Sequence, residues 1–158
     1  MASRRKEIIE FLVTQVKEID GAASGFDSSY TYNVNVFNNV FRKLKFLDEI
    51  NDFPGIYISA GTENRDFNSQ NLTTATLDAT IRIYVYGEDD AQSQVDDLLQ
   101  DVEHVIYNLG DNPDKGILDI TISNISTDEG LVTPYGLGEI ELEILYILES
   151  GEKNYGIS

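Results

Sequence analysis

Residues 74–109 show the clearest alternation of hydrophobic and polar positions in the chain. Between positions 77 and 85 every second residue is apolar, a period typical of a strand with one buried face. These residues are Leu77, Ala79, Ile81, Ile83 and Val85. After Gly87 and three acidic residues, apolar side chains recur at helical spacing as far as Leu109, and Gly110 can supply a C-cap. The pattern predicts a strand followed by an amphipathic helix that lies back over it.

Similar patterns predict a second helix and three more strands. Ser3 can cap a helix that runs to about Asp20 with one apolar stripe, and Gly21 can end it. Pro54 and Gly55 open a short strand, and two later segments alternate apolar and polar residues. The predicted strands cover 56–60, 118–123 and 139–148. In the second of them, the predicted apolar face consists of Leu118, Ile120 and Ile122.

The remaining segments are mostly polar. Residues 61–71 combine glycine, asparagine, aspartate and serine and are long for a hairpin turn, so we expect a mobile loop in the isolated protein. Further loops are predicted at 21–33, 110–116 and 127–138. Between the first of these loops and the first strand, part of a mixed segment is predicted to be helical, over 46–51.

The elements follow one another as helix, irregular segment, two strands, helix and two strands. Such a chain most simply forms an α+β fold, in which two amphipathic helices cover one face of a mainly antiparallel four-stranded sheet. We expect a single domain over residues 1–149 and a flexible C-terminal tail over 150–158.

The composition narrows the function. The 158 residues include 11 basic and 28 acidic side chains, which give a net charge of 11 − 28 = −17. This charge opposes binding to nucleic-acid phosphates and repels other copies of the chain, so self-association needs apolar or locally complementary patches. The absence of cysteine excludes disulfides and thiolate metal sites. No apolar run approaches the roughly 20 residues that span a bilayer, so we expect no membrane partner.

The basic residues gather in two small clusters. They are Arg4, Arg5 and Lys6 near the N-terminus, and Arg42, Lys43 and Lys45 farther along the chain. Positive charge is unfavourable at a helix N-terminus. The first cluster is therefore either a frayed, hydrated helix end or a docking site for an acidic neighbour.

The acidic residues around the predicted helix that ends at Leu109 form no evident catalytic pair. They are Glu88, Asp89, Asp90, Asp96, Asp97 and Asp101. A hard cation needs several converging oxygens, but only Asp97 and Asp101 share a helix face and no calcium-loop spacing is present. We interpret the acids as exposed charges that support the helix, by about 0.3 to 1 kcal/mol each where they lie near its N-terminus. His104, the one histidine, is predicted to lie on the solvent face without a paired base.

Three acidic residues alternate with apolar ones along the last strand. They are Glu139, Glu141 and Glu143. Like charges gathered on one face require that face to be hydrated. The row is either a solvated sheet surface protected against edge pairing or a carboxylate wall along which a polyanion slides without binding.

Several short pieces, taken in order, resemble the tail terminator (tail completion) proteins of tailed bacteriophages. The first pieces are the helix start at 4–9 and the beginning of a strand at 53–58, followed by 61–63. The later pieces are the strand 77–86 that precedes the acidic helix, and residues 128–130 and 135–136, which come before a last strand ending at Tyr146. The resemblance spans most of the chain. Its order is more specific than any single piece.

The resemblance implies a homo-oligomeric ring, usually of six copies, that caps the finished tail tube, stops its growth and offers a surface to the head or neck. The implied partners are other copies of the chain, the tail tube protein and a head-tail connector or neck protein, while DNA passes through without sequence-specific binding. No cofactor and no enzymatic activity are implied. The implied location is the virion tail or neck, reached from the host cytoplasm during assembly.

Under this interpretation the expected contact residues fall into two groups. The partner interface comprises the two basic clusters together with Glu63, Arg65, Asp66 and Phe67 of the polar connection. The residues expected to face the lumen are Glu139, Glu141 and Glu143. Mobile polar segments that become ordered on contact are common in assembly proteins.

Three alternatives stay open at this point. The chain could be another neck or head-tail connector component. It could be an acidic divalent-metal-dependent enzyme such as a nuclease, which needs carboxylates gathered in a pocket. It could also be a DNA-mimicking inhibitor, which needs acids spaced like phosphates on one exposed face.

Overall fold

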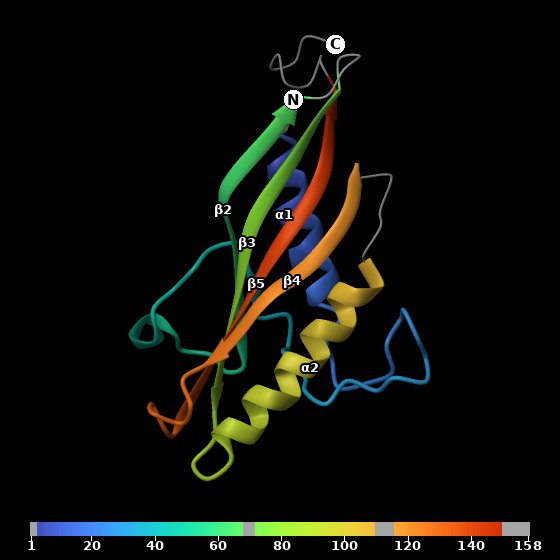
Figure 1. The fold of residues 1–158 in the computed structure, drawn as a ribbon. Helices are drawn as coiled ribbons and strands as arrows, with labels where there is room; N and C mark the ends of the chain where they lie inside the picture. Colours follow the sequence, from blue (N-terminus) through green and yellow to red (C-terminus); the bar gives the residue numbers. More distant parts are fainter. Residues whose placement is uncertain (1–2, 68–71, 110–115, 150–158) are drawn as a thin grey trace.

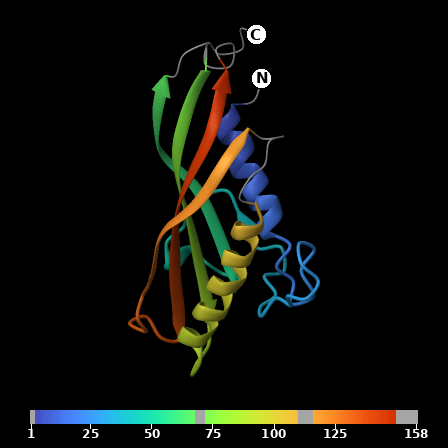
Figure 2. The same cartoon turned by 45° about the vertical axis from the view of Figure 1, so that its right-hand side comes forward.

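The computed structural model describes residues 3–67, 72–109 and 116–149. Its elements are α1 (Arg4–Val16), β1 (Val40–Phe41), η1 (Leu47–Glu49), β2 (Gly55–Phe67), β3 (Leu72–Tyr86), α2 (Ala91–Leu109), β4 (Ile117–Thr127) and β5 (Tyr135–Glu149). The strands form one long twisted sheet in the order β1-β2-β3-β5-β4, and α1 and α2 pack against the same face of it (Figures 1 and 2).

The sheet differs from the predicted one in strand number and direction. It has five strands and is mixed, because β1 pairs with β2 in parallel, with Val40 opposite Ile56. The prediction of a mainly antiparallel four-stranded sheet is therefore wrong, although the α+β arrangement fits. A strand of two residues has no periodicity to read, and its place is set by long-range pairing such as the bond from the Ile56 N–H to the Asn39 carbonyl (2.8 Å).

The strands β2 and β3 continue as a paired hairpin as far as Phe67, which lies opposite Thr73. The predicted mobile loop over 61–71 is therefore wrong for residues 61–67, while 68–71 lie outside the described residues. Most side chains of 61–67 are exposed, and a register shift between Ala60 and Glu63 interrupts any alternation. Backbone pairing with β3 thus holds a strand whose side chains bury little surface.

The main core lies between the sheet and both helices. It contains the five alternating residues predicted in β3, which are all buried. The helices contribute Ile8, Ile9, Leu12 and Val16 from α1, and Val95, Leu98, Leu99, Val102, Val105, Ile106 and Leu109 from α2. Ser3 caps α1, as predicted, by accepting a hydrogen bond from the Lys6 N–H. The helix ends at Val16 and not at about Asp20, yet Ile19 stays in the core.

A second, smaller apolar cluster covers one end of the opposite sheet face. It consists of Ile50, Tyr57 and Tyr84. The Tyr84 hydroxyl donates to the carbonyl of Lys45, so the chain between β1 and β2 folds over this end of the sheet. Here β3 is covered on both faces, which its alternating pattern does not predict. The predicted helix over 46–51 is only the 3₁₀ turn η1.

The first residues of β4 depart from the predicted alternation. Ile117 is buried and Leu118, expected on the apolar face, is 43% exposed. The register with β5 shifts between Ile117 and Asp119, and this bulge places Ile117 and Ile120 on the core side. The predicted C-cap at Gly110 and the predicted tail over 150–158 lie outside the described residues.

Candidate functional site

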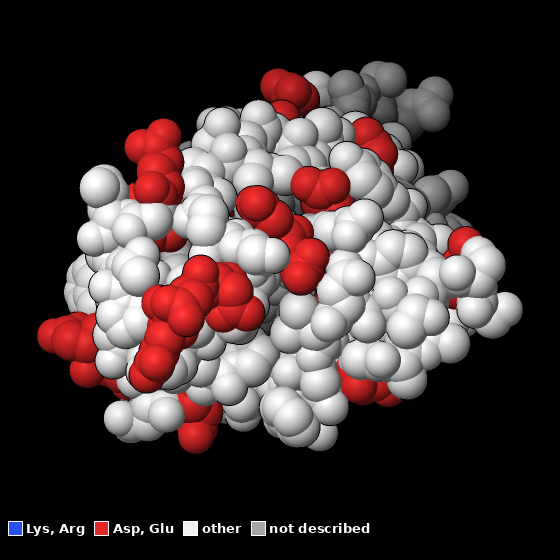
Figure 3. All heavy atoms as spheres, turned by 90° about the horizontal axis from the view of Figure 1, so that it is seen from below, with Lys and Arg blue, Asp and Glu red and all other residues white. Residues whose placement is uncertain are grey.

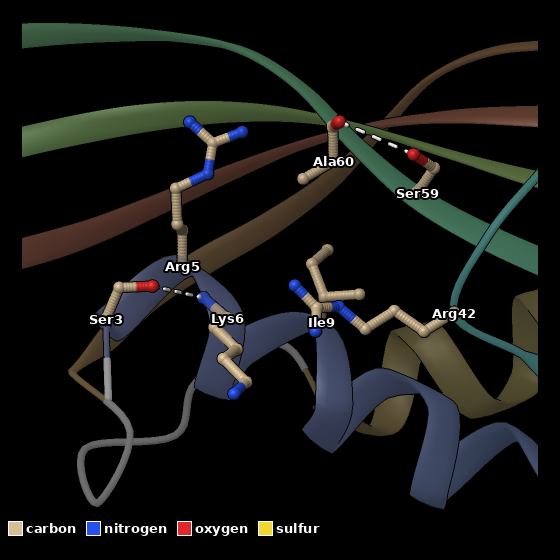
Figure 4. A pocket seen from close by; sticks show the side chains of 7 residues that line it. All are labelled: Ser3, Arg5, Lys6, Ile9, Arg42, Ser59 and Ala60. Carbon is tan, nitrogen blue, oxygen red and sulfur yellow. Dashed lines mark hydrogen bonds between the residues drawn. The ribbon is translucent and has the colours of Figure 1, made fainter. Parts of the chain in front are cut away.

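The fold brings members of the two basic clusters to one open hollow beside α1 and β2. The hollow is lined by Ser3, Arg5, Lys6, Ile9, Arg42, Ser59 and Ala60 (Figure 4). Arg5 and Lys6 come from the first turn of α1, and Arg42 directly follows β1. Because β1 joins the sheet beside β2, a residue far along the chain meets the start of the first helix. We call this site the basic hollow.

Contacts within the basic hollow hold one of its arginines more firmly than the other. Arg5 donates from Nη2 to the carbonyl of Gly61 at 2.8 Å, so its guanidinium lies against β2 (Figure 4). Arg42 lies 3.7 Å from the carboxylate of Glu10, and both side chains are about half exposed. An exposed pair of this kind contributes less than about 1 kcal/mol. Arg42 can therefore leave Glu10 for another anion at little cost.

The other members of the two clusters do not line the basic hollow. Arg4 is half-buried and Lys43 is exposed. Lys45 lies against the smaller apolar cluster, with its ammonium 6.0 Å from the ring centroid of Tyr57. Lys45 thus helps to fix the chain over the sheet, a role that its place in a run of basic residues does not indicate.

Some candidate residues of the β2–β3 hairpin hold the hairpin in place, and others are exposed. Glu63 has a side chain only 6% exposed, and it accepts hydrogen bonds from Arg65 Nε (2.6 Å) and from the hydroxyl of Tyr146. Burial, together with the bond to Glu63, raises the pKa of the Tyr146 hydroxyl. Asp66 and Phe67 are exposed near the end of the hairpin. Glu63 therefore supports the hairpin, and Asp66 and Phe67 present a surface.

The acidic row on β5 lies on the sheet face opposite the helices. The alternation is as predicted, because the apolar residues between the three glutamates are buried. Glu139 is paired with Arg82 of β3 at 2.9 Å, and both are partly exposed. Glu141 and Glu143 are exposed, and Glu143 lies opposite Asp78 of β3. The unneutralised charge of the row is therefore concentrated at Glu141, Glu143 and Asp78.

Two residues of α2 that were predicted to face solvent are covered by the chain after α1. Asp101 is fully buried and accepts hydrogen bonds from the backbone N–H groups of Asn33 (3.0 Å) and Val34 (2.9 Å) and from the hydroxyl of Tyr30 (2.8 Å). Burial raises the pKa of this carboxyl, and the hydrogen bonds oppose the rise. The interpretation of Asp101 as an exposed charge is wrong, because a helical wheel does not show an irregular segment folding over it.

His104 lies under the same segment. Its ring stacks on Tyr30, with the centroids 3.9 Å apart and the planes within 5°. Its Nε2 is 2.8 Å from the hydroxyl oxygen of Ser24, which is buried. The predicted solvent-facing position is wrong, and the imidazole packs as part of the contact between α2 and the preceding loop.

The acidic residues before α2 lie at one end of the molecule. Figure 3 looks onto this end, where carboxylates gather and no lysine or arginine is visible. Glu88, Asp89 and Asp90 are exposed there, and Asp90 accepts a hydrogen bond from Gln94 (2.9 Å). Among the described residues, no three acidic or histidine side chains converge to form a metal-binding group. The acids at this end form a surface charge and not a pocket.

Comparison with known proteins gives this geometry its biological setting. A family model described as "Bacteriophage Tail Tube Terminator Protein" matches residues 2–152. The chain belongs to this family. A relative, "Tail tube terminator protein p142" of Escherichia phage T5, is 29% identical over 154 residues, which cover 90% of this chain and 92% of the relative.

The predicted family is thereby confirmed, and with it the role of a structural tail terminator in a bacteriophage tail. A tail tube terminator associates with the tail tube. In the part of the chain that the structure describes, no helix is both long enough and apolar enough to cross a membrane.

Proposed function

We propose that the chain assembles into a closed ring of six copies that caps the finished tail tube, stops its growth and provides the surface to which the head or neck joins. The family match across residues 2–152 carries this proposal. A ring requires each copy to contact two neighbours through different surfaces, since such contacts close when the rotation between copies allows it. The protein acts as a structural component, without a cofactor or catalytic activity.

The sheet face that carries Glu139, Glu141 and Glu143 lines the lumen of this ring. The exposure of Glu141 and Glu143, on the sheet face that the helices leave open, supports this placement at the lumen. A carboxylate surface repels nucleic-acid phosphates, so DNA passes without sequence-specific binding. Glu139 contributes less repulsion, because Arg82 neutralises it.

The basic hollow and the exposed end of the β2–β3 hairpin form the docking surface for the neighbouring tail proteins. Arg5, Lys6 and Arg42 offer cationic groups in an otherwise acidic chain, and they fit an acidic segment of the tube protein or of the head-tail connector. The other proposed interface residues flank or support them: Arg4, Lys43, Lys45, Glu63, Arg65, Asp66 and Phe67. Assembly takes place in the host cytoplasm, and the finished protein resides in the virion tail or neck.

Electron microscopy of assembled tails tests the ring and its capping role. Phage that lack this protein are expected to give tubes of uncontrolled length or tails that fail to join heads. Tails of normal length joined to heads in the deletion strain would contradict the proposal. The purified protein added to tubes is expected to appear as a closed ring at one end.

A pair of lysine variants on the same helix tests the docking surface. Lys6→Glu reverses a charge in the basic hollow, and Lys17→Glu reverses an exposed charge at the other end of α1. The first variant is expected to lose tube or head joining while it keeps its melting temperature, because acidic residues are favourable at a helix N-terminus. The second is expected to assemble normally. Equal assembly by both variants would show that the basic hollow is not part of the interface.

A further inference from the structure

An open groove lies where β2 begins, and it shares no lining residue with the basic hollow. It has a volume of about 590 Å³ and is lined from the segments before β1 and β2, the end of β3 and the first turns of α2. The lining includes three aromatic rings, one carboxylate and two side-chain amides, from Phe37, Phe53, Tyr86, Asp52, Asn51 and Gln94. We call this site the aromatic groove.

The aromatic rings of the groove are fixed and partly open to solvent. Phe37 is 68% exposed, and Tyr86 is 43% exposed. Phe53, Tyr86 and Tyr135 contact one another, with ring centroids between 5.3 and 6.3 Å apart. Rings held by such packing can contact a ligand at little cost in conformational entropy.

The backbone at Phe37 has a conformation that few side chains adopt. Its φ is +52° and that of Asn38 is +62°, both in the left-handed region. For a bulky side chain this region is rare and costs free energy. Hydrogen bonds fix the turn, from the Phe37 N–H to the Asn35 side chain (2.8 Å) and from the Asn39 N–H to the Val36 carbonyl (2.9 Å). A strained turn that holds a large apolar ring in solvent indicates a role in binding.

The charged groups at the groove are acidic. Among the described residues, Asp52 is the one charged member of the lining, and its carboxylate has no hydrogen bond or ion pair. A Cβ atom at Gly87, which follows Tyr86, would lie 2.3 Å from Asp90 Oδ1 and 2.5 Å from Gln94 Nε2, so a second carboxylate lies beside the lining. At this end of the molecule carboxylates gather and no lysine or arginine is visible (Figure 3). The groove therefore attracts positive charge.

This combination of rings, carboxylates and amides fits an arginine side chain. A guanidinium stacks on an aromatic ring while its N–H groups donate to carboxylate and amide oxygens. Asp52 and Asp90 repel an acidic segment or a nucleic-acid phosphate. A purely apolar segment would cover the Asp52 carboxylate without giving it a partner, which is unfavourable. The occupant that matches the groove is a basic peptide segment.

We propose that the aromatic groove binds an arginine-bearing segment of a neighbouring tail protein, with the guanidinium against the rings of Phe37 and Tyr86 and the carboxylate of Asp52. This inference rests on the proposed function, in which the terminator meets the tube on one side and the head or neck on the other. The basic hollow fits an acidic segment and the aromatic groove a basic one. The two sites therefore distinguish the two neighbours by charge.

Binding of two labelled octapeptides tests the groove directly. One probe alternates arginine with serine, and the other alternates lysine with serine. The natural chain is expected to bind the arginine peptide more tightly, because a guanidinium both stacks on a ring and donates hydrogen bonds in a fork. The largest amide NMR shifts are expected at 37–39 and 51–54. Equal affinity for the two peptides, or shifts spread evenly over the acidic surface, would overturn the proposal.

Two pairs of matched variants separate the groove from overall charge. Phe37→Ala and Phe46→Ala each remove an exposed phenylalanine, but Phe46 lies outside the groove. Asp52→Asn and Asp48→Asn each remove one exposed negative charge, and only Asp52 lines the groove. The groove variants are expected to weaken binding of the arginine peptide roughly two- to tenfold, and the controls are expected to leave it unchanged. Equal losses within each pair would overturn the proposal.

Phage that carry these variants separate failure of the groove from failure of the proposed function. Phe37→Ala combined with Asp52→Asn is expected to form rings but to lose joining to the tube or to the head. Phe46→Ala combined with Asp48→Asn is expected to assemble normally. Normal joining on both sides by the groove variant would overturn the groove contact and leave the proposed function standing. Loss of the ring itself would also overturn it, because a second copy would then be the occupant. If the natural protein caps no tubes, the proposed function fails, and the peptide measurements still decide the groove.

Discussion

Asp101 shows how one buried carboxylate can fix a long irregular segment. Two backbone N–H groups and the Tyr30 hydroxyl donate to it, and a fourth donor, the side-chain amide of Asn33, lies 3.1 Å away. The segment after α1 has little regular structure of its own, so these bonds attach it to α2. Tyr30 then stacks on His104, which extends the contact along the helix.

We expect Asp101→Asn to lower the free energy of unfolding by about 1 to 3 kcal/mol, because an amide nitrogen would face a backbone N–H donor in the buried site. Asp97→Asn on the same helix is the matched control. Its side chain is exposed, so the change should stay within about 0.5 kcal/mol. Urea denaturation of both variants measures the difference. Equal stability of the two variants would show that the Asp101 contacts contribute nothing.

The raised pKa of Asp101 also predicts a pH dependence. Its carboxyl binds a proton more tightly in the folded chain than in the unfolded one, because burial penalises the charged form. Its contribution to stability is therefore complete below the ordinary value of 3.8 and is lost as the pH rises through the folded pKa. We expect the advantage of the natural chain over Asp101→Asn to shrink as the pH rises above 3.8. An advantage that grows with pH would contradict this sign.

At the scale of elements, two glycines in β5 allow α2 to lie close to the sheet. A Cβ atom at Gly136 would lie 2.6 Å from Val95 Cγ2 and 3.0 Å from the carbonyl of Ala91, both on α2. At Gly138 it would lie 3.0 Å from Ile83 and 3.2 Å from Val95. The close approach buries the first turns of α2 against β3 and β5.

We expect Gly136→Ala to destabilise the protein by about 1 to 3 kcal/mol, since the contacts include backbone and leave no room for a methyl group. Gly61→Ala is the control. Its Cβ would meet only the Asp78 carbonyl, at the ordinary distance of 3.5 Å, so the change should be neutral or stabilising by up to about 1 kcal/mol. Thermal unfolding of both variants checks this. A Gly136→Ala protein as stable as the natural one would show that α2 can shift without cost.

At the scale of the whole molecule, charge and assembly oppose each other. The chain has a net charge of −17, some of its acids gather at one end, and three of its cations, Arg5, Lys6 and Arg42, meet in the basic hollow. Raising the ionic strength from about 0.01 M to about 0.15 M shortens the screening length from about 30 Å to about 8 Å. Screening weakens repulsion between whole copies and also weakens contacts made by opposite charges.

We expect salt to increase the fraction of protein in rings, because screening weakens the repulsion between copies that each carry a net charge of −17. Light scattering across salt and protein concentration measures this fraction. Rings that dissociate as salt is added would indicate that opposite charges hold the copies together, for example the basic hollow against the acidic end of a neighbour. Docking onto the tube through the basic hollow should show the reverse dependence and weaken with salt.

The sequence predicted the elements in which apolar residues recur at a regular spacing or a capping residue is present. The inward residues of β3, the stripe of α2, the Ser3 cap and the alternation around Glu141 were all readable, because periodicity and capping are local properties. The order of short pieces was enough to indicate the tail terminator family, which the match over 2–152 confirms. The docking and lumen roles of individual residues stay predictions.

Only the tertiary structure decided the features that depend on partners far along the chain. The strand β1 and the outer half of β2 exist because neighbouring strands supply their hydrogen bonds, and bulges at Glu63 and Ile117 shift the alternation that a sequence pattern assumes. Asp101 is buried because residues 30–34 fold back over α2. Local pattern determines which face of an element is apolar, but burial and strand pairing are set by whatever segment comes to lie against it.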